Sequence, residues 1–242
     1  MAVIECQFQD LAVQLFGKNR RATGISRSSR ALSNIIPSLK NLTVLDLGCG
    51  VGYMTVGALR LGARRVVALD TEDIQRLLLQ NVEINRFSPK AAKFQKSDLF
   101  STLRKGIKFN VIVANLPQHA LPATPSAKKL RGKYGGYDGT DLVCRALTEG
   151  AYYLKRGGRY FGSISRLTNF RRTMTIADSL YKIKIRKTIT KTLDHNEMAP
   201  YLTDARLLEH LAALRKQGLI EYKINKHEQI EYKVHLCEFI LK

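Results

Sequence analysis

A glycine-rich segment, Asp46-Leu-Gly-Cys-Gly-Val-Gly52, has the composition of a ligand-binding turn. It follows the apolar run 42–47 and precedes a helical pattern that begins at Tyr53. Glycines between a strand and a helix let the backbone turn tightly and leave no Cβ in the way of a bound group. Their spacing is not the GxGxxG of dinucleotide sites, so a different ligand is expected here.

Three aspartates accompany the first three expected strands. Asp46 lies two residues before the first glycine, where its charge would repel a pyrophosphate and favour a ligand carrying an ammonium and a sulfonium. S-adenosylmethionine is such a ligand. Asp70 ends the strand 65–70 and could accept both ribose hydroxyl protons, while Asp98 follows the strand 92–95 and could accept the adenine amino hydrogens. Strand-end acids of an ordinary α/β protein are the alternative interpretation.

The strand 109–114 ends in Asn115-Leu-Pro-Gln118, where an acceptor substrate is expected. The side-chain oxygen of Asn115 and the carbonyl of Leu116 could accept the two hydrogens of an NH₂ group and aim its lone pair at a methyl group. Methyl transfer then depends mainly on orientation, and Pro117 would stiffen the loop. His119 could act as a base or be an exposed loop residue. An Asx turn would explain the loop equally well.

Strand-like and helical patterns alternate along the middle of the chain. Strands are expected at 42–47, 65–70, 92–95, 109–114 and 158–165, with helices at 53–61, 73–86 and 138–154. This order predicts an α/β fold with a mostly parallel, seven-stranded sheet flanked by helices. Near the C-terminus, Thr203 is expected to cap a helix that closes at Gly218, and 220–224 and 230–236 form an antiparallel strand pair.

The domain expectation is an N-terminal helical, basic cover segment over residues 1–40 and a catalytic domain over 41–242. Residues 5–16 have loose helical spacing, and a short apolar helix is expected at 31–39, disturbed at Pro37. The start resembles no secretory signal, and the chain has no apolar run long enough to span a membrane. The four cysteines form no CxxC pair, so neither disulfides nor a metal site are expected and the cytoplasm is the expected compartment.

Positive charge dominates the composition. Among 242 residues, 40 Lys and Arg stand against 20 Asp and Glu, a net charge of +20. Cations gather at 18–30, at 128–133 and at 166–192, where eight of them face only Asp178. His195 lies in a polar segment just beyond. Such charge favours a polyanionic partner such as RNA or the ribosome, with a solvated basic surface as the alternative.

The chain resembles the class I S-adenosylmethionine-dependent methyltransferases at four places. These are the segment 46–52, Asp70, Ser97-Asp-Leu-Phe100 and the segment 115–118. The branch that holds HemK-type glutamine methyltransferases and ribosomal-RNA guanine-N2 methyltransferases is the most similar. Asn81 and Asn85 also look like that branch, and Tyr134-Gly-Gly-Tyr-Asp-Gly139 is similar to its Gly-Gly-x-Asp-Gly segment. The resemblance covers about residues 40–165 and implies a Rossmann-like fold with S-adenosyl-L-methionine as cofactor.

The resemblance also implies roles for individual residues. The cofactor would be held by Asp46, Gly48, Cys49, Gly50, Gly52, Asp70, Thr71, Ser97, Asp98, Leu99 and Asn115. Asn115, Leu116 and Pro117 would form the catalytic loop, and Gln118, His119, Tyr134 and Tyr137 would contact the substrate. The family motif is Asn-Pro-Pro-Tyr or Asn-Pro-Pro-Phe, so Gln118 removes an aromatic face that Tyr134 or Tyr137 could supply instead.

These observations predict a methyltransferase that acts on a nitrogen in RNA or in a ribosome-associated protein, including a glutamine amide. Two other functions stay open. One is methylation of a nitrogen or oxygen in a small anionic metabolite, which the departures at 116 and 118 and the short N-terminus favour. The other is a non-catalytic nucleic-acid-binding module that retains a cofactor pocket.

Overall fold

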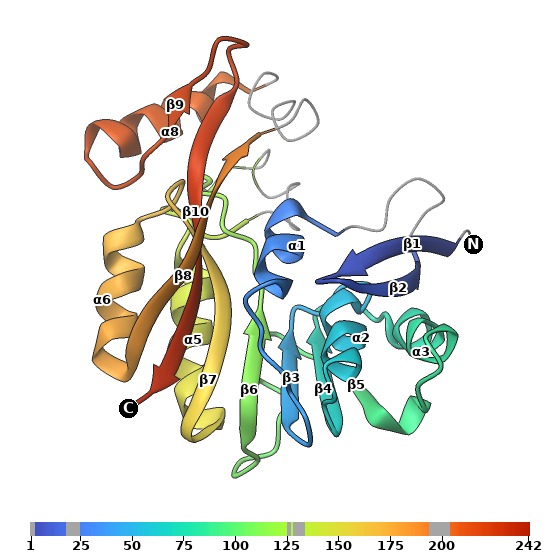
Figure 1. Ribbon diagram of the computed structural model, residues 1–242. Coiled ribbons are helices and arrows are strands. Elements are labelled where there is room, and N and C mark those ends of the chain that lie inside the picture. The colour runs from blue at the N-terminus through green and yellow to red at the C-terminus, as the bar shows by residue number, and fades with distance from the viewer. Residues whose placement is uncertain (1–2, 18–24, 125–126, 128–133, 194–203) are drawn as a thin grey trace. The chain divides into compact units, whose positions relative to one another are not determined.

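The computed structural model describes residues 3–17, 25–124, 127, 134–193 and 204–242 (Figure 1). The chain divides into two compact units. Unit 1 comprises Met1–Asn115, Glu149–Gly162 and Glu238–Lys242. Unit 2 comprises Leu116–Thr148 and Ser163–Cys237. No helix in the described part of the chain is long and apolar enough to cross a membrane.

Unit 1 is built on parallel strands whose order is β5-β4-β3-β6-β7. Their bounds are β3 (Thr43–Leu47), β4 (Arg65–Asp70), β5 (Ala92–Lys96), β6 (Phe109–Ala114) and β7 (Leu154–Ser165). The central strands are largely buried and mostly apolar, as expected for a parallel sheet covered on both faces. Because Leu47 pairs with Ala114 and Asp70 with Lys96, the carboxyl ends of neighbouring strands lie at one edge.

The helices of unit 1 are α1 (Arg27–Ser33), α2 (Tyr53–Arg60) and α3 (Gln75–Ile84), with a short 3₁₀ helix η1 (Pro89–Ala91). The helix expected at 31–39 is therefore shifted: α1 begins four residues earlier and ends before Pro37, which cannot continue a helix. Both α2 and α3 fall inside their expected ranges, because their apolar residues repeat at helical spacing.

The helical expectation for residues 5–16 is wrong. This segment forms an antiparallel hairpin of β1 (Val3–Phe8) and β2 (Leu11–Phe16). The buried side chains are those of Cys6, Phe8, Val13 and Leu15, so burial repeats every two residues along each strand. The tight turn at Gln9, whose φ is 55°, reverses the chain between them.

Two asparagines of α3 fasten this hairpin to the rest of unit 1. Asn81 Oδ1 accepts a hydrogen bond from Phe16 N at 2.6 Å, and its Nδ2 donates to Phe16 O and, at 2.7 Å, to Val51 O in the glycine turn. Asn85 forms the same paired contact with the backbone of Gln14, at 3.0 and 2.6 Å. Since Asn81 bonds both β2 and the glycine turn, it links the N-terminal segment to a candidate ligand-binding element.

Unit 2 contains α6 (Phe170–Leu180), β8 (Tyr181–Thr192), α8 (Ala205–Lys216) and β9 (Lys223–Ile224). Three elements contribute residues to both units: α5 (Asp141–Tyr153), β7 and β10 (Ile230–Leu241). The strand order is β5-β4-β3-β6-β7-β10-β8, and β9 pairs with β10. The predicted mostly parallel α/β sheet with antiparallel C-terminal strands is confirmed, and β8 is an eighth strand that the sequence did not predict.

Two details of the C-terminal third differ from expectation. β8 was not expected, because its lysines and threonines conceal a strand whose exposed residues outnumber its buried ones. β9 contains only two of the residues expected at 220–224. Thr203 lies outside the described residues, and the N-cap of α8 is Asp204, whose side chain accepts a hydrogen bond from Arg206 N.

Candidate active site

The glycine turn has the backbone geometry that its sequence requires. Gly48, Gly50 and Gly52 have φ values of 74°, 51° and 88°, in the left-handed region that favours glycine. The amides of Gly48 and Cys49 both donate to Leu69 O, at 2.8 and 3.0 Å, and so tie the turn to β4. A Cβ at Gly50 would meet no heavy atom within 4 Å, so the chain leaves open space on that side of the turn.

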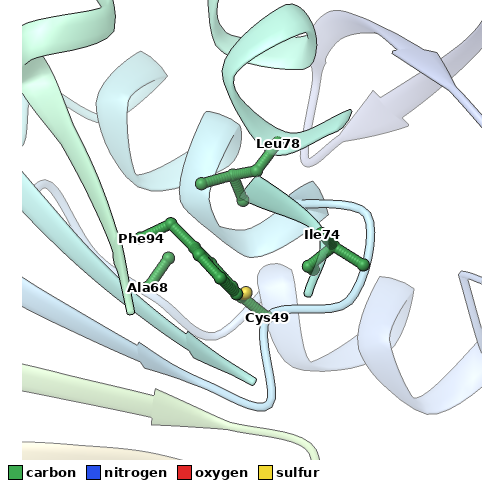
Figure 2. Close-up of a cluster of buried hydrophobic side chains, with 5 residues drawn as sticks. All are labelled: Cys49, Ala68, Ile74, Leu78 and Phe94. Atoms are coloured by element: carbon green, nitrogen blue, oxygen red, sulfur yellow. The ribbon is translucent and has the colours of Figure 1, made fainter. Parts of the chain in front are cut away.

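A buried apolar cluster supports the turn from within unit 1 (Figure 2). It consists of Cys49, Ala68, Ile74, Leu78 and Phe94. The Cys49 side chain lies among these residues and contributes packing. At Gly52 a Cβ would stand 2.7 Å from the Leu78 Cδ1, so any larger residue there would disturb both the turn and the cluster.

Asp70 connects the glycine turn to the end of β4. Its Oδ2 accepts a hydrogen bond from Gly50 N at 2.9 Å, and its Oδ1 accepts one from Glu72 N at 3.0 Å. These bonds fix the carboxylate at the strand end, and each oxygen has a second lone pair for a further donor. Thr71, the next residue, is exposed.

The segment after β5 adjoins Asp70 through the backbone. Ser97 N donates to Asp70 O at 2.7 Å, and the Ser97 hydroxyl accepts a hydrogen bond from Thr102 N at 3.2 Å. Leu99 is buried with a φ of 48°, whereas Asp98 is exposed. The structure thus brings Gly50, Asp70 and Ser97 together by direct hydrogen bonds and places Asp98 next to them in the chain.

Asp46 is buried at the end of β3, with only 2% of its surface exposed. Its Oδ2 accepts a hydrogen bond from the Thr55 hydroxyl at 2.6 Å. Burial raises the pKa of Asp46 to about 7, the Thr55 hydrogen bond opposes this shift, and the nearby Asp70 adds to it. In the described part of the chain, no cationic side chain lies within ion-pair distance of Asp46. A cation supplied by a ligand would therefore stabilise the ionised form.

Asn115 follows β6 at the same edge of the unit 1 sheet. Its Nδ2 donates to the hydroxyls of Ser29 at 2.7 Å and Ser26 at 3.0 Å, with Ser28 at 3.4 Å. Ser26 is also the N-cap of α1, where it accepts from Ser29 N. The hydroxyls hold one end of the carboxamide and fix the direction of its oxygen.

Residues 115–118, called the acceptor loop below, continue into unit 2, where the Gln118 side chain is bonded to β7. Gln118 Nε2 donates to Ser163 O at 2.7 Å, and Gln118 Oε1 accepts from Ser165 N at 2.9 Å. Gln118 therefore anchors the loop to the strand end, while Leu116 is buried and Pro117 half-buried.

A second glycine-rich turn, residues 135–139, packs closely against the acceptor loop. Gly135 N donates to His119 O at 2.9 Å, beside an isolated bridge between His119 and Tyr134. A Cβ at Gly135 would stand 2.7 Å from Gln118 Cα, and one at Gly139 2.8 Å from Gln118 O. Both glycines are needed because the two backbones approach too closely for a side chain.

Asp138 fixes the turn to the start of α6. Although burial alone would raise its pKa, hydrogen bonds from Thr140 and Asn169 and the positive charge of Arg172 hold the pKa of Asp138 below its ordinary value. Asn169 Nδ2 lies 3.0 Å from Asp138 Oδ2, and Arg172 Nη1 lies 3.4 Å from the carboxylate.

Tyr137, in the same turn, presents its ring to solvent. Its side chain is 57% exposed. The ring lies edge-on to His210 of α8, with 4.5 Å between ring centres, and His210 Nε2 lies 2.7 Å from Tyr137 O. His210 therefore braces an exposed aromatic face that belongs to the turn supporting the acceptor loop.

Several supporting residues were not expected from the sequence. They are Thr55, Ser26, Ser29, Ser163, Ser165 and His210. The capping role of Ser26 could have been predicted, because Ser-Arg-Ser-Ser before an apolar run is typical of a helix N-terminus. Thr55 lies nine residues from Asp46, and the remaining residues act across longer sequence separations. The expected cations at 128–133 and His195 lie outside the described residues.

Comparison with known proteins identifies the family. Residues 26–136 match the pattern of the ribosomal protein L11 methyltransferase family. A Methanocaldococcus jannaschii protein, named as a proposed protein N5-glutamine methyltransferase, is 31% identical over 160 residues, which is 64% of this chain and 77% of the relative. The chain belongs to the class I S-adenosylmethionine-dependent methyltransferases.

Other relatives share smaller parts of this methyltransferase. A ribosomal protein L11 methyltransferase from Agathobacter rectalis is 35% identical over 102 residues, which is 39% of this chain and 31% of the relative. A T. thermophilus 16S rRNA N2 methyltransferase, solved with AdoMet and guanosine, has a TM-score of 0.60 at 16% identity. That comparison covers 100% of this chain and 50% of the other, and it shows a shared fold.

Proposed function

We propose that this methyltransferase methylates a planar nitrogen group, an amide or a base amine, in RNA or a ribosome-associated protein. The arrangement around Asn115 is the observation that carries the proposal. When bound, S-adenosylmethionine supplies a methyl group activated by its sulfonium. The residues of the chain then have to bind the cofactor and orient the acceptor nitrogen.

The cofactor half of the proposal rests on the ends of β3 and β4. Asp46 would lie near the cationic methionine end, because it is a buried carboxylate with no cationic partner among the described residues. Asp70, already held by Gly50 N and Glu72 N, would accept the ribose hydroxyls. Asp98 would accept the adenine amino group. The open side of Gly50 fits close approach of a ligand to the backbone.

The catalytic half rests on Asn115 and the carbonyl of Leu116. Because Ser26 and Ser29 hold Nδ2, the carboxamide oxygen points away from these hydroxyls. It would accept one N–H of the acceptor, and the Leu116 carbonyl would accept the other. This aims the nitrogen lone pair at the methyl carbon and stabilises the positive charge that develops on nitrogen. Because Ser26 and Ser29 belong to residues 1–40, their contacts with Asn115 also support a role of this segment in covering the site.

A planar acceptor is favoured by Tyr137 and by the relatives. Gln118 occupies the place of the family's aromatic residue and is engaged by the β7 backbone, so it offers no ring. Tyr137, in the turn packed against the acceptor loop, offers an exposed ring suited to stacking on an amide or a base. The relatives named above act, by their names, on a glutamine amide, a ribosomal protein and an rRNA base.

Transfer of a radiolabelled methyl group into a cell extract tests the proposal. The protein is incubated with labelled S-adenosylmethionine and extract, and the products are digested separately with nuclease and protease. Asn115→Ala serves as the background control, since the extract contains methyltransferases of its own. Label that depends on Asn115 and is released by nuclease or protease supports the proposal. Asn115-dependent label in small metabolites, or none above background, contradicts it.

A further inference from the structure

The basic stretch between residues 166 and 192 lies largely on one edge strand of unit 2. β8 is the last strand in the sheet order, so only one of its edges is paired within the sheet. Its twelve residues include five cations and no acid. The cations are Lys182, Lys184, Arg186, Lys187 and Lys191.

Three of these cations point the same way. Side chains alternate along a strand, so Lys182, Lys184 and Arg186 share one face with Thr188 and Thr190. All five are exposed, whereas Tyr181, on the opposite face, is fully buried. Successive same-face cations are roughly 6.7 Å apart along the strand, twice the rise per residue. The face is a regular row of positive charge on an extended backbone.

The neighbouring strand β10 extends this row. Thr188 Oγ1 lies 2.8 Å from His235 Nδ1, which places His235 and the exposed Lys233 on the same face. Burial is the main cause that lowers the pKa of His235, and the positive charges of Arg166 and Lys233 contribute to the shift, whereas Glu221 opposes it. Of the acids near the row, Glu221 is engaged by Arg166, and Glu231 is half-buried.

We infer that this face, formed by Lys182, Lys184, Arg186, Thr188 and Lys233, binds the phosphate backbone of RNA. A polyphosphate chain presents charge at regular intervals, which matches the regular row better than an acidic peptide with irregular charge does. Lysine, arginine and threonine side chains can donate to phosphate oxygens but offer no ring for stacking on a base, so the proposed contacts are to phosphates and are independent of sequence. Within the described residues, no acid lies within ion-pair distance of Lys182, Lys184 or Lys233.

This inference deepens the proposed function by naming the surface that binds an RNA substrate, and it can be tested without methylation. Binding of a short fluorescent RNA strand is measured by anisotropy at increasing salt, with no cofactor present. The test variant is K182Q/K184Q/R186Q. A matched control, K40Q/K90Q/K93Q, removes the same charge from exposed lysines of unit 1.

The test variant should bind RNA roughly 10–100-fold more weakly at about 0.15 M salt, and its salt slope should fall by about 2 for three lost contacts to a single strand. The control should change affinity less than about threefold. Circular dichroism and cofactor affinity should stay those of the wild type. The inference is overturned if the wild type does not bind RNA, if both variants weaken alike, or if a polyglutamate peptide of equal charge competes as well as RNA. Repeating the measurement in Asn115→Ala separates this surface from catalysis, because RNA affinity should survive there.

Discussion

Two buried aspartates, one in each unit, have opposite protonation behaviour. Asp138 of unit 2 is surrounded by donors from Thr140, Asn169 and Arg172, and its pKa lies below the ordinary value despite burial. Asp46 of unit 1 has the Thr55 hydroxyl as its hydrogen-bond partner, and burial raises its pKa to about 7.

The difference fits a structural role for Asp138 and the cofactor-binding role that we propose for Asp46. Unit 2 supplies its own positive charge to Asp138, so the ionised carboxylate stabilises the turn that supports the acceptor loop. The described residues of unit 1 supply none to Asp46, so its ionisation is unfavourable below about pH 7 and would be favoured by a ligand that carries positive charge. In the proposed function, the cofactor region around Asp46 and Asp70 would be completed by the positive charge of the cofactor. The acceptor region, residues 115–118 with the turn at 135–139, is held in place by side chains of the protein itself.

The largest effect should come from Asn115→Ala. Because Asn115 would stabilise charge that develops only during transfer, kcat should fall by about 10²–10³-fold. The Kd for S-adenosylmethionine should change less than about threefold by calorimetry. Gln75→Ala, an exposed amide on α3, is the control and should retain full activity. A variant that loses cofactor affinity as strongly as kcat would assign Asn115 to the cofactor region alone.

Asp46→Asn should weaken cofactor binding roughly 10–100-fold, because the neutral amide no longer complements a cation. Titration calorimetry at pH 8 measures this change. Asn retains an oxygen that can accept from Thr55, so the fold should be preserved. Unchanged affinity would contradict a role of Asp46 in cofactor binding and would leave no functional difference between the two aspartates.

The same Asp46→Asn variant should be more stable than the wild type at high pH when no cofactor is present. A carboxyl whose pKa is raised from 3.8 to about 7 takes up a proton on folding, so wild-type stability falls as pH rises from about 4 to 7. The variant lacks this loss and should gain about 1–3 kcal/mol at pH 8, and little at pH 4. Thermal unfolding at both pH values measures the difference, and a gain independent of pH would contradict it.

Asp138→Asn should have the opposite effect on stability. Its amide would direct a donor at Asn169 and Arg172, at a cost of about 1–3 kcal/mol at pH 7. Because the pKa of Asp138 is lowered in the folded state, its ionised form stabilises the wild type above the unfolded-state pKa, and this stabilisation is lost as pH falls through the folded-state pKa. The difference in free energy of unfolding between the wild type and the variant should therefore become smaller in acid. Urea unfolding at pH 7 and pH 3 tests this, with cofactor affinity expected to stay within about twofold. A variant as stable as the wild type at pH 7 would show that Asp138 is not a structural acid.

The smallest effect should come from Tyr137→Leu. Loss of the stacking ring should raise KM for the acceptor about 3–10-fold with little change in kcat, whereas Tyr137→Phe should resemble the wild type. Steady-state kinetics with the identified acceptor separates the two variants. Equal KM values would place the substrate contact elsewhere in the acceptor region.

Local patterns explain which parts of this molecule could be predicted from its sequence. β4 and β6 have the predicted bounds because each is a short run with β-branched residues between turn residues, which favours a strand over a helix. Glycine turns and strand-end acids are also local, so Gly50 and Asp70 could each be named as candidate cofactor residues from the sequence, although their hydrogen bond could not. By contrast, the β1–β2 hairpin was misassigned because its apolar residues fit both helical and alternating spacing over a short length.

The roles that were missed depend on contacts between distant segments. Nothing local indicates that Asn115 reaches Ser26 and Ser29, or that Gln118 bonds the backbone at the end of β7. The exposed row on β8 was visible only as a charge excess, because its strand geometry comes from pairing with β10. The cofactor region was therefore more predictable than the acceptor region.

The asparagines of α3 have a further consequence for association between molecules. An outer strand with unsatisfied amides and carbonyls can pair with a strand of another chain. Asn81 and Asn85 bond the backbone of Phe16 and Gln14, and so occupy alternate positions along the outer edge of β2. The two side-chain amides thus occupy hydrogen-bonding positions that a neighbouring strand would use, and they block edge-to-edge pairing along β2.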